Sequence, residues 1–337
     1  MPINLLINKL IDIVGKDNVI TQKEDLEPYS HDETLGLKQL PQLVIKPGST
    51  KEISQIMKLA NRERVAITPR GGGTGLSGGA VPSPGGIVMS FERMNKIKEI
   101  DTENLMAVVE PGVITAVLAD EAKKYDLFYP PDPSSLDSCT IGGNVAECAG
   151  GARTIKYGTT KNYVTGLEAV LPNGAVIRCG GKLVKNVTGY NLIDLLIGSE
   201  GTLGIVTEVT LRLLHLPRLK VDLFIPYQDI ESATKTTREI LRHKIIPSTI
   251  EFMEQEGIEA SEHYLGKKLP FKGEKGVCSL LIEIDGERKE ELDKEYDELG
   301  EIALKNGAID VLVAVSKSEQ DRLWKSAELF RMPWNQK

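Results

Sequence analysis

Residues 69–79 read Pro69-Arg70-Gly71-Gly72-Gly73-Thr74-Gly75-Leu76-Ser77-Gly78-Gly79, with glycine at six of the eleven positions. Glycine lacks a Cβ atom and adopts positive φ angles without strain, so such a run lets a ligand approach the main chain and aligns successive N–H groups toward an anion. We therefore expect a phosphate or pyrophosphate here. A flexible linker is the alternative, but linkers are rich in serine, whereas this run lies between two apolar stretches.

The same run also fits the spacing of a dinucleotide-binding fingerprint. Gly73–Gly78 matches G-x-G-x-x-G, and Glu92 occupies the acidic position about twenty residues later. That fingerprint requires a helix to begin at its last glycine, whereas Pro82 and Pro84 prevent a continuous helix there. A nicotinamide-binding Rossmann unit would need residues 80–91 to be helical, so we reject it.

The glycine run is instead expected to connect two strands. Up to residue 217 the patterns predict helices at 3–14, 50–62, 115–125 and 191–197, and strands at 43–47, 65–68, 87–91, 107–113, 164–171, 175–179 and 205–213. Beyond Pro217 glycine becomes sparse, and strands at 220–226, 249–253, 277–284 and 309–315 accompany helices at 229–242 and 289–306. These patterns predict an α+β chain with one domain over residues 1–218 and a second over residues 219–337.

Composition excludes several classes of function. The chain has 41 basic and 48 acidic residues, a net charge of −7, and no basic cluster, which argues against a nucleic-acid partner. No apolar run is long enough to span a membrane and the first residues do not resemble a signal peptide, so a cytoplasmic location is expected. The four cysteines form no C-x-x-C pair and the four histidines are scattered, so no metal site is predicted.

Three later segments repeat the glycine-rich or rigid character of the first. Pro130–Ser135 is a proline-rich loop, Thr140–Gly151 carries two glycine pairs and is followed by Tyr157 and Gly158, and Gly198–Gly204 runs directly into a predicted strand. Three unrelated turns are the alternative interpretation. Four such segments in order favour several loops that close around one large ligand.

These motifs resemble the FAD-binding domain of the flavoprotein oxidoreductases related to vanillyl-alcohol oxidase. Within that superfamily they are similar to the branch of the glycolate oxidase flavoprotein subunit and the D-lactate and D-2-hydroxyglutarate dehydrogenases. The segments that carry this closer resemblance are Ile141–Asn144, Ala149–Gly151, Thr188–Leu192 and Gly198–Gly204.

The resemblance implies an FAD-binding domain of two subdomains, followed by a ferredoxin-like α+β cap domain that is incomplete in this chain. It implies non-covalent FAD, because Thr74 stands in the loop where relatives with a covalent flavin often have a histidine. The residues that it assigns to the cofactor are Pro69, Arg70, Gly71, Gly72, Gly73, Thr74, Gly75, Leu76, Ser77, Gly78, Pro131, Asp132, Pro133, Ser134, Thr140, Gly142, Gly143, Asn144, Ala146, Gly150, Gly151, Tyr157, Gly158, Glu200, Gly201, Gly204 and Ile205.

Two departures from the family pattern concern the cap. Related cap domains continue past the position of Lys337, and the continuation carries the histidines and the acid that bind a divalent metal, so no metal is expected here. Ala327 stands where the motif L-W-x-x-R has the arginine that binds the substrate carboxylate, and alanine cannot replace a guanidinium fork. Arg331, one turn further along, and Arg322 are the candidates to compensate.

The implied function is an FAD-dependent dehydrogenase that oxidises a small 2-hydroxy acid, of the D-lactate or glycolate type, to the 2-oxo acid. The α-hydrogen of the substrate would pass as hydride to the flavin N5 while a base, which we do not assign, takes the hydroxyl proton. An electron-transfer flavoprotein or an iron–sulfur subunit would accept the electrons. The alternative is a truncated FAD-binding electron-transfer or assembly subunit without hydroxy acid turnover.

Overall fold

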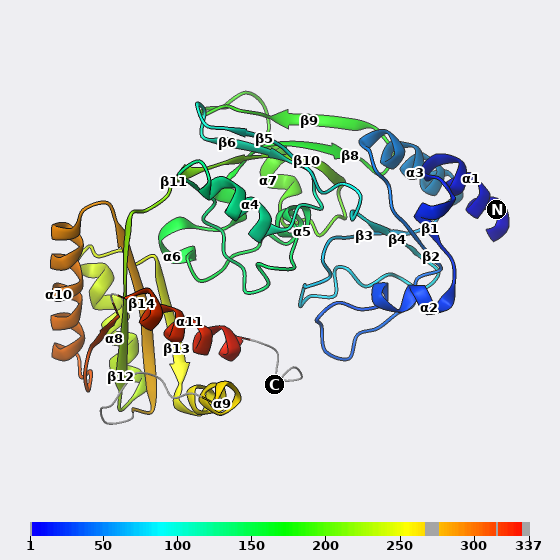
Figure 1. The fold of residues 1–337 in the computed structure, drawn as a ribbon. Helices are drawn as coiled ribbons and strands as arrows, with labels where there is room; N and C mark the ends of the chain where they lie inside the picture. The colour runs from blue at the N-terminus through cyan, green and yellow to red at the C-terminus, as the bar shows by residue number, and fades with distance from the viewer. Residues whose placement is uncertain (1, 267–275, 315, 332–337) are drawn as a thin grey trace. The chain divides into compact units, whose positions relative to one another are not determined.

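The computed structural model describes residues 2–266, 276–314 and 316–331, and it divides the chain into two compact units. The first unit consists of residues 1–149 and 159–215, and the second of residues 150–158 and 216–337. Figure 1 labels most of the elements of both units. The short segment Gly150–Gly158 therefore belongs to the second unit, although it lies within the range 1–218 predicted for the FAD-binding domain.

A four-stranded sheet in the first unit carries the glycine-rich run. Its order is β1-β2-β4-β3, with β1 Val19–Ile20, β2 Leu43–Ile45, β3 Ile67–Arg70 and β4 Ile87–Ser90. Both β2 and β3 run parallel to β4. Helices α1 (Ile3–Val14) and α3 (Thr50–Glu63) contribute buried residues to the apolar core of this sheet. Residues 71–86 contain no helix, which confirms that the glycine-rich run connects two strands and is not a Rossmann turn.

A second sheet of five antiparallel strands completes the first unit. Its order is β5-β6-β10-β8-β9, with β5 Ile97–Asp101, β6 Met106–Val109, β8 Val164–Val170, β9 Val176–Gly180 and β10 Ile205–Arg212. Helices α4 (Thr115–Lys123), α5 (Ile141–Glu147) and α7 (Leu192–Leu196) belong to this part. Smaller elements are α2 (Lys23–Leu26) and the paired strands β7 (Leu127–Phe128) and β11 (Leu214–His215).

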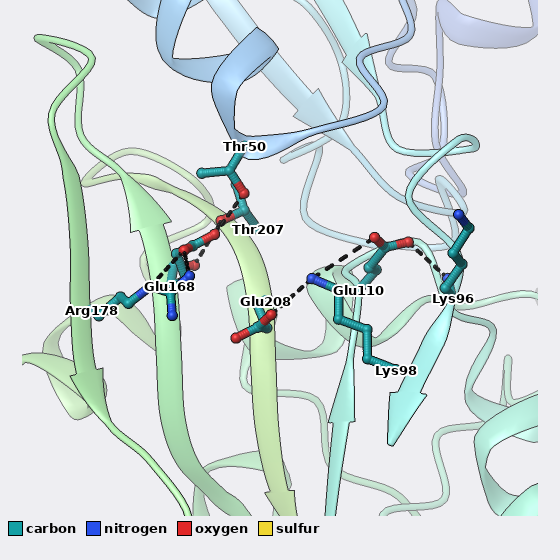
Figure 2. Close-up of polar contacts among 8 residues, drawn as sticks. All are labelled: Thr50, Lys96, Lys98, Glu110, Glu168, Arg178, Thr207 and Glu208. Carbon is teal, nitrogen blue, oxygen red and sulfur yellow. Dashed lines mark hydrogen bonds and ion pairs between the residues drawn. The ribbon is translucent and has the colours of Figure 1, made fainter. Parts of the chain in front are cut away.

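A buried glutamate ties α3 to the five-stranded sheet (Figure 2). The Glu168 carboxylate on β8 accepts hydrogen bonds from Thr50 Oγ1 at 2.6 Å, Thr207 Oγ1 at 2.8 Å and Arg178 Nε at 2.8 Å. Burial tends to raise the pKa of Glu168, but these donors outweigh it and the pKa is lowered. Since Thr50 lies in the first turn of α3, Glu168 fixes the helix that packs on the glycine-bearing sheet.

The second unit is a ferredoxin-like α+β fold. Its antiparallel sheet has the order β13-β14-β12-β15, with β12 Leu219–Tyr227, β13 Thr249–Glu254, β14 Cys278–Gly286 and β15 Leu312–Ala314. Helices α8 (Ile230–Arg242) and α10 (Lys289–Lys305) cover one face, and α9 (Gln255–Leu265) and α11 (Lys317–Arg331) lie over the other (Figure 1). The predicted α+β cap architecture is confirmed. The short helix α6 (Thr154–Tyr157) also belongs to this unit.

Two features of the fold differ from expectation. The segment after Thr140, expected to be a loop because of its glycine pair, forms helix α5, since the Thr140 side chain caps it by accepting from Gly143 N at 3.3 Å. The strand expected at 65–68 lies at Ile67–Arg70, so the glycine-rich run begins directly at its end.

Candidate functional site

A buried arginine holds the start of the glycine-rich loop. Arg70 is 8% exposed, and it donates from Nη1 to the His31 carbonyl at 2.7 Å and from Nη2 to the Pro28 carbonyl at 3.0 Å. Burial lowers the pKa of its guanidinium, while the negative charge of Asp32 opposes that effect. Arg70 thus ties the segment around residues 28–32 to the loop, and two of its donors are committed to the main chain.

The next glycines lie directly against the segment that begins helix α5. A Cβ atom on Gly71 would lie 2.2 Å from Thr140 Oγ1, and one on Gly72 would lie 2.2 Å from the Ser138 carbonyl oxygen. Neither position can hold a side chain without displacing its neighbour. Sequence reasoning assigned these glycines to close approach of a ligand, and the structure adds a second cause, the packing of one predicted loop on another.

The loop at Gly198–Gly204 joins the same place. Gly198 N donates to the Val145 carbonyl at 3.0 Å and Glu200 N donates to the Ala146 carbonyl at 2.9 Å, so this loop is fixed to α5. Gly201 has a φ of 72°, and a Cβ there would lie 2.4 Å from Pro69 Cγ. Three of the four predicted segments therefore meet within the first unit.

The main chain at this meeting point suits an anion. Within the described residues, the N–H groups of Gly72, Gly73, Thr74 and Gly75 donate no hydrogen bond to the protein. Successive free N–H groups in a turn form a concave site for phosphate oxygens, and Gly73 supplies the positive φ, 70°, that such a turn needs. The residues present therefore fit a pyrophosphate-bearing cofactor.

Carboxylates surround the later half of the loop. Ser77 Oγ donates to Glu147 Oε2 at 3.1 Å, and a Cβ on Gly79 would lie 2.8 Å from Glu147 Oε1 and 3.2 Å from Glu200 Oε2. Burial raises the pKa of Glu147, and the charges of Glu200 and Asp32 raise it further. Sequence reasoning included Glu200 but missed Asp32, which lies outside every glycine-bearing segment, and Glu147, which lies within Thr140–Gly151 but is not a glycine.

The side chains of Asn144, Ile205 and Leu76 lie in different surroundings. Asn144 Nδ2 donates to Thr115 Oγ1 at 2.8 Å in a buried position, and the Ile205 side chain lies in the core of the first sheet. The Leu76 side chain is exposed. Pro131–Ser134 follow β7 as an irregular stretch, as predicted, and it is Ser138 beyond them that contacts the glycine-rich loop.

The predicted residues Gly150, Gly151, Tyr157 and Gly158 belong to the second unit. There Tyr157 OH donates to Asp285 Oδ2 at 2.6 Å, and the neighbouring Lys156 donates to the Asp285 carbonyl at 3.1 Å and pairs with its carboxylate. The Tyr157 hydroxyl is therefore engaged with the ferredoxin-like sheet.

The acid that completed the dinucleotide fingerprint has a structural role. Glu92 accepts from Tyr29 OH at 2.6 Å, Lys46 Nζ at 2.6 Å and Ser90 Oγ at 2.9 Å. Burial opposes ionisation, but these three donors prevail and lower the pKa of Glu92. A carboxylate held in this way is not free to bind a ribose.

In the second unit, the position expected for a substrate arginine lies in an apolar core. Ala327 on α11 is 2% exposed and packs among buried residues that include Phe224 and Leu281. The side chain of Arg331, the suggested substitute, lies outside the described residues. No group of three or more His, Cys, Asp or Glu side chains that could hold a metal ion occurs in the described part of the chain.

Comparison with known proteins assigns both parts of the chain. Residues 41–180 match the family described as FAD binding domain, and residues 216–333 match the family described as FAD linked oxidases, C-terminal domain. D-lactate dehydrogenase of Anaerostipes hadrus is 39% identical over 323 residues, which cover 95% of this chain and 68% of that protein. The chain belongs to the FAD-linked oxidase family. FAD is its cofactor.

A second relative and a solved structure are also similar to this FAD-linked oxidase. Glycolate oxidase subunit GlcD of Bacillus subtilis is 44% identical over 311 residues, 92% of this chain and 65% of that protein. The chain thus spans about two thirds of the length of these curated relatives. A crystal structure of alkyldihydroxyacetonephosphate synthase superposes with a TM-score of 0.81 at 21% identity, covering 98% of this chain and 65% of that one, and this likeness concerns the fold. Among the described residues, no helix is both long and apolar enough to cross a lipid bilayer.

Proposed function

We propose that the protein is an FAD-dependent dehydrogenase that oxidises a small 2-hydroxy acid, of the D-lactate or glycolate type, to the 2-oxo acid and passes the electrons to a protein acceptor. The relatives named glycolate oxidase subunit and D-lactate dehydrogenase support the substrate class. An electron-transfer flavoprotein or an iron–sulfur subunit is the proposed acceptor. The cytoplasmic location stays a prediction.

This proposal rests on the place in the first unit where three glycine-bearing segments meet. The N–H groups of Gly72–Gly75 would bind the pyrophosphate, while Thr140 and Gly201 hold the neighbouring segments in place. When bound, FAD supplies a two-electron acceptor in its isoalloxazine ring. We propose that it is bound without a covalent link, since Thr74 cannot form the histidyl bond of some relatives.

A second candidate is an FAD-binding electron-transfer or assembly subunit without hydroxy acid turnover. The burial of Ala327 in an apolar core favours it, because that position offers no cation to a substrate carboxylate. The two candidates share the cofactor and differ in the chemistry that it performs.

Anaerobic mixing separates the candidates. The FAD-loaded protein is mixed with D-lactate, glycolate or D-2-hydroxyglutarate, and the visible absorbance of the flavin is followed. Bleaching by at least one acid is expected of a dehydrogenase. No bleaching with any of them, in a protein that dithionite does reduce, would favour the electron-transfer candidate.

A further inference from the structure

One carboxylate beside the glycine-rich loop has an oxygen without a partner. Asp32 is 4% exposed, its Oδ1 accepts from Thr34 N at 3.0 Å, and its Oδ2 has no hydrogen-bond partner among the described residues. Burying such an oxygen is costly unless a donor reaches it, and buried polar groups in native proteins are nearly always satisfied. A donor from outside the chain is therefore expected at Asp32 Oδ2.

The unpartnered oxygen faces the loop. It lies 3.8 Å from the position that a Cβ on Gly75 would occupy, and Glu147 Oε1 lies 3.8 Å from the same point. Glu33 N donates to the Gly75 carbonyl at 3.0 Å, so the residue next to Asp32 is fixed to the loop. Arg70 Nη1 donates to the carbonyl of His31, the residue before Asp32, so both chain neighbours of Asp32 are fixed. The acceptor is thus rigidly placed over Gly75.

The charges along the loop divide it into two halves. The atoms nearest to Cβ positions on Gly71 and Gly72 come from Thr140 and Ser138, which are uncharged. A Cβ position on Gly73, between the two halves, lies 2.1 Å from Nη2 of the cationic Arg70. The positions on Gly75 and Gly79 lie nearest to carboxylate oxygens of Asp32, Glu147 and Glu200. An anion in the later half would meet like charge, whereas a neutral hydroxyl would meet acceptors.

We infer that Asp32 accepts a hydrogen bond from a sugar or ribityl hydroxyl of bound FAD, while the pyrophosphate lies toward the earlier half of the loop. This rests on the proposed FAD site. A hydroxyl fits as the donor, because it is neutral and because the hydroxyls of FAD lie on both sides of its pyrophosphate, nearer to it than the neutral N–H groups of its two ring systems. Asp32 thereby positions the cofactor and takes no part in the redox step.

The test measures the dissociation constants of FAD, FMN and ADP by calorimetry for the wild type and for Asp32→Ala. A hydrogen bond to a charged group corresponds to roughly a ten- to hundredfold change in affinity, so Asp32→Ala is expected to weaken FAD binding by about that factor. If Asp32→Ala also binds FMN more weakly but binds ADP as the wild type does, the donor is a ribityl hydroxyl. If ADP binds more weakly and FMN does not, the donor is a ribose hydroxyl.

Ser30→Ala is the matched control. Ser30 is fully buried in the same segment and donates from Oγ to the Glu27 carbonyl at 2.7 Å, so its loss loosens the segment without touching Asp32. Unchanged FAD affinity in Asp32→Ala, or an equal loss in Asp32→Ala and Ser30→Ala, would overturn the inference. The proposed function is judged separately, by bleaching of the FAD-saturated wild type, so either idea can fail while the other stands.

Discussion

Gly72 illustrates how a single residue controls the cofactor site. A methyl group there would lie 2.2 Å from the Ser138 carbonyl oxygen, a main-chain atom that cannot rotate away. We expect Gly72→Ala to lower the free energy of unfolding by about 1–3 kcal/mol, as overpacked substitutions do, and to weaken FAD binding because the N–H groups move. Chemical denaturation and FAD titration check both effects.

Gly300→Ala provides the comparison for that substitution. Gly300 lies inside helix α10, and a Cβ there would make an ordinary contact of 3.8 Å with Val311. Alanine in a helix interior is favoured over glycine by up to about 1 kcal/mol, so this variant should be slightly stabilised and should bind FAD normally. If Gly72→Ala behaved like Gly300→Ala, the close packing of the glycine-rich loop would be contradicted.

Asp222 makes the stability of the second unit depend on pH. It is fully buried on β12, its Oδ2 accepts from Trp324 Nε1 at 3.0 Å, and its Oδ1 has no partner among the described residues. Burial, with the charge of Glu283 on the opposing strand, raises the pKa of Asp222 from 3.8 to about 7. The folded state therefore holds a proton that the unfolded state releases between these values.

The raised pKa of Asp222 sets the direction in which the stability changes with pH. Stability from protonated Asp222 is fully present below about pH 4 and is lost as the pH rises toward 7. Asp222→Asn cannot ionise, so its stability relative to the wild type should rise by about 1–4 kcal/mol between pH 4 and pH 8. Melting curves of both proteins at these two pH values test this. If the difference in stability between the two proteins did not change with pH, the pKa of Asp222 would be the same in the folded and the unfolded state.

At the scale of elements, the Glu168 cluster holds α3 and the five-stranded sheet together (Figure 2). Glu168→Ala leaves Thr50 and Thr207 without their acceptor, so we expect a loss of about 1–3 kcal/mol in the free energy of unfolding. Glu208→Ala is the control, because Glu208 pairs with Lys98 at 2.8 Å near the surface and such pairs contribute about 1 kcal/mol or less. Equal losses in urea denaturation would contradict the role of Glu168.

Elements that depend on the local sequence pattern could be predicted, whereas elements that depend on contacts between distant residues could not. Helix α3, with Ser49 as its cap, and the hairpin of β8 and β9 follow from periodicity and turn residues. Helix α5 was hidden by its glycine pair, because the cap at Thr140 outweighs the low helix propensity of glycine there. Helix α9 was not predicted, and of α11 only the turn from Ala327 to Arg331 was expected. Sequence alone did not indicate that Gly150–Gly158 joins the second unit.

The glycines of the candidate site and Glu200 could be predicted from the sequence, whereas Asp32 and Glu147 could not. A glycine cluster is a local feature of the sequence, so the segments at 69–79, 140–147 and 198–204 could be marked in advance. Asp32 is held beside the loop by the hydrogen bond of Glu33 to Gly75 and by the bond of Arg70 to the His31 carbonyl, contacts that no spacing in the sequence encodes.

For the whole molecule, membership of the FAD-linked oxidase family identifies the cofactor, and oxidation of a 2-hydroxy acid is the central claim. The most direct measurement is the amount of 2-oxo acid formed per flavin reduced, when FAD-saturated protein is mixed anaerobically with D-lactate or glycolate. Oxidation of a 2-hydroxy acid removes two electrons, which fully reduce one flavin, so we predict one 2-oxo acid per bleached flavin. Flavin that stays oxidised in the presence of every 2-hydroxy acid, or that bleaches without formation of 2-oxo acid, would contradict the account.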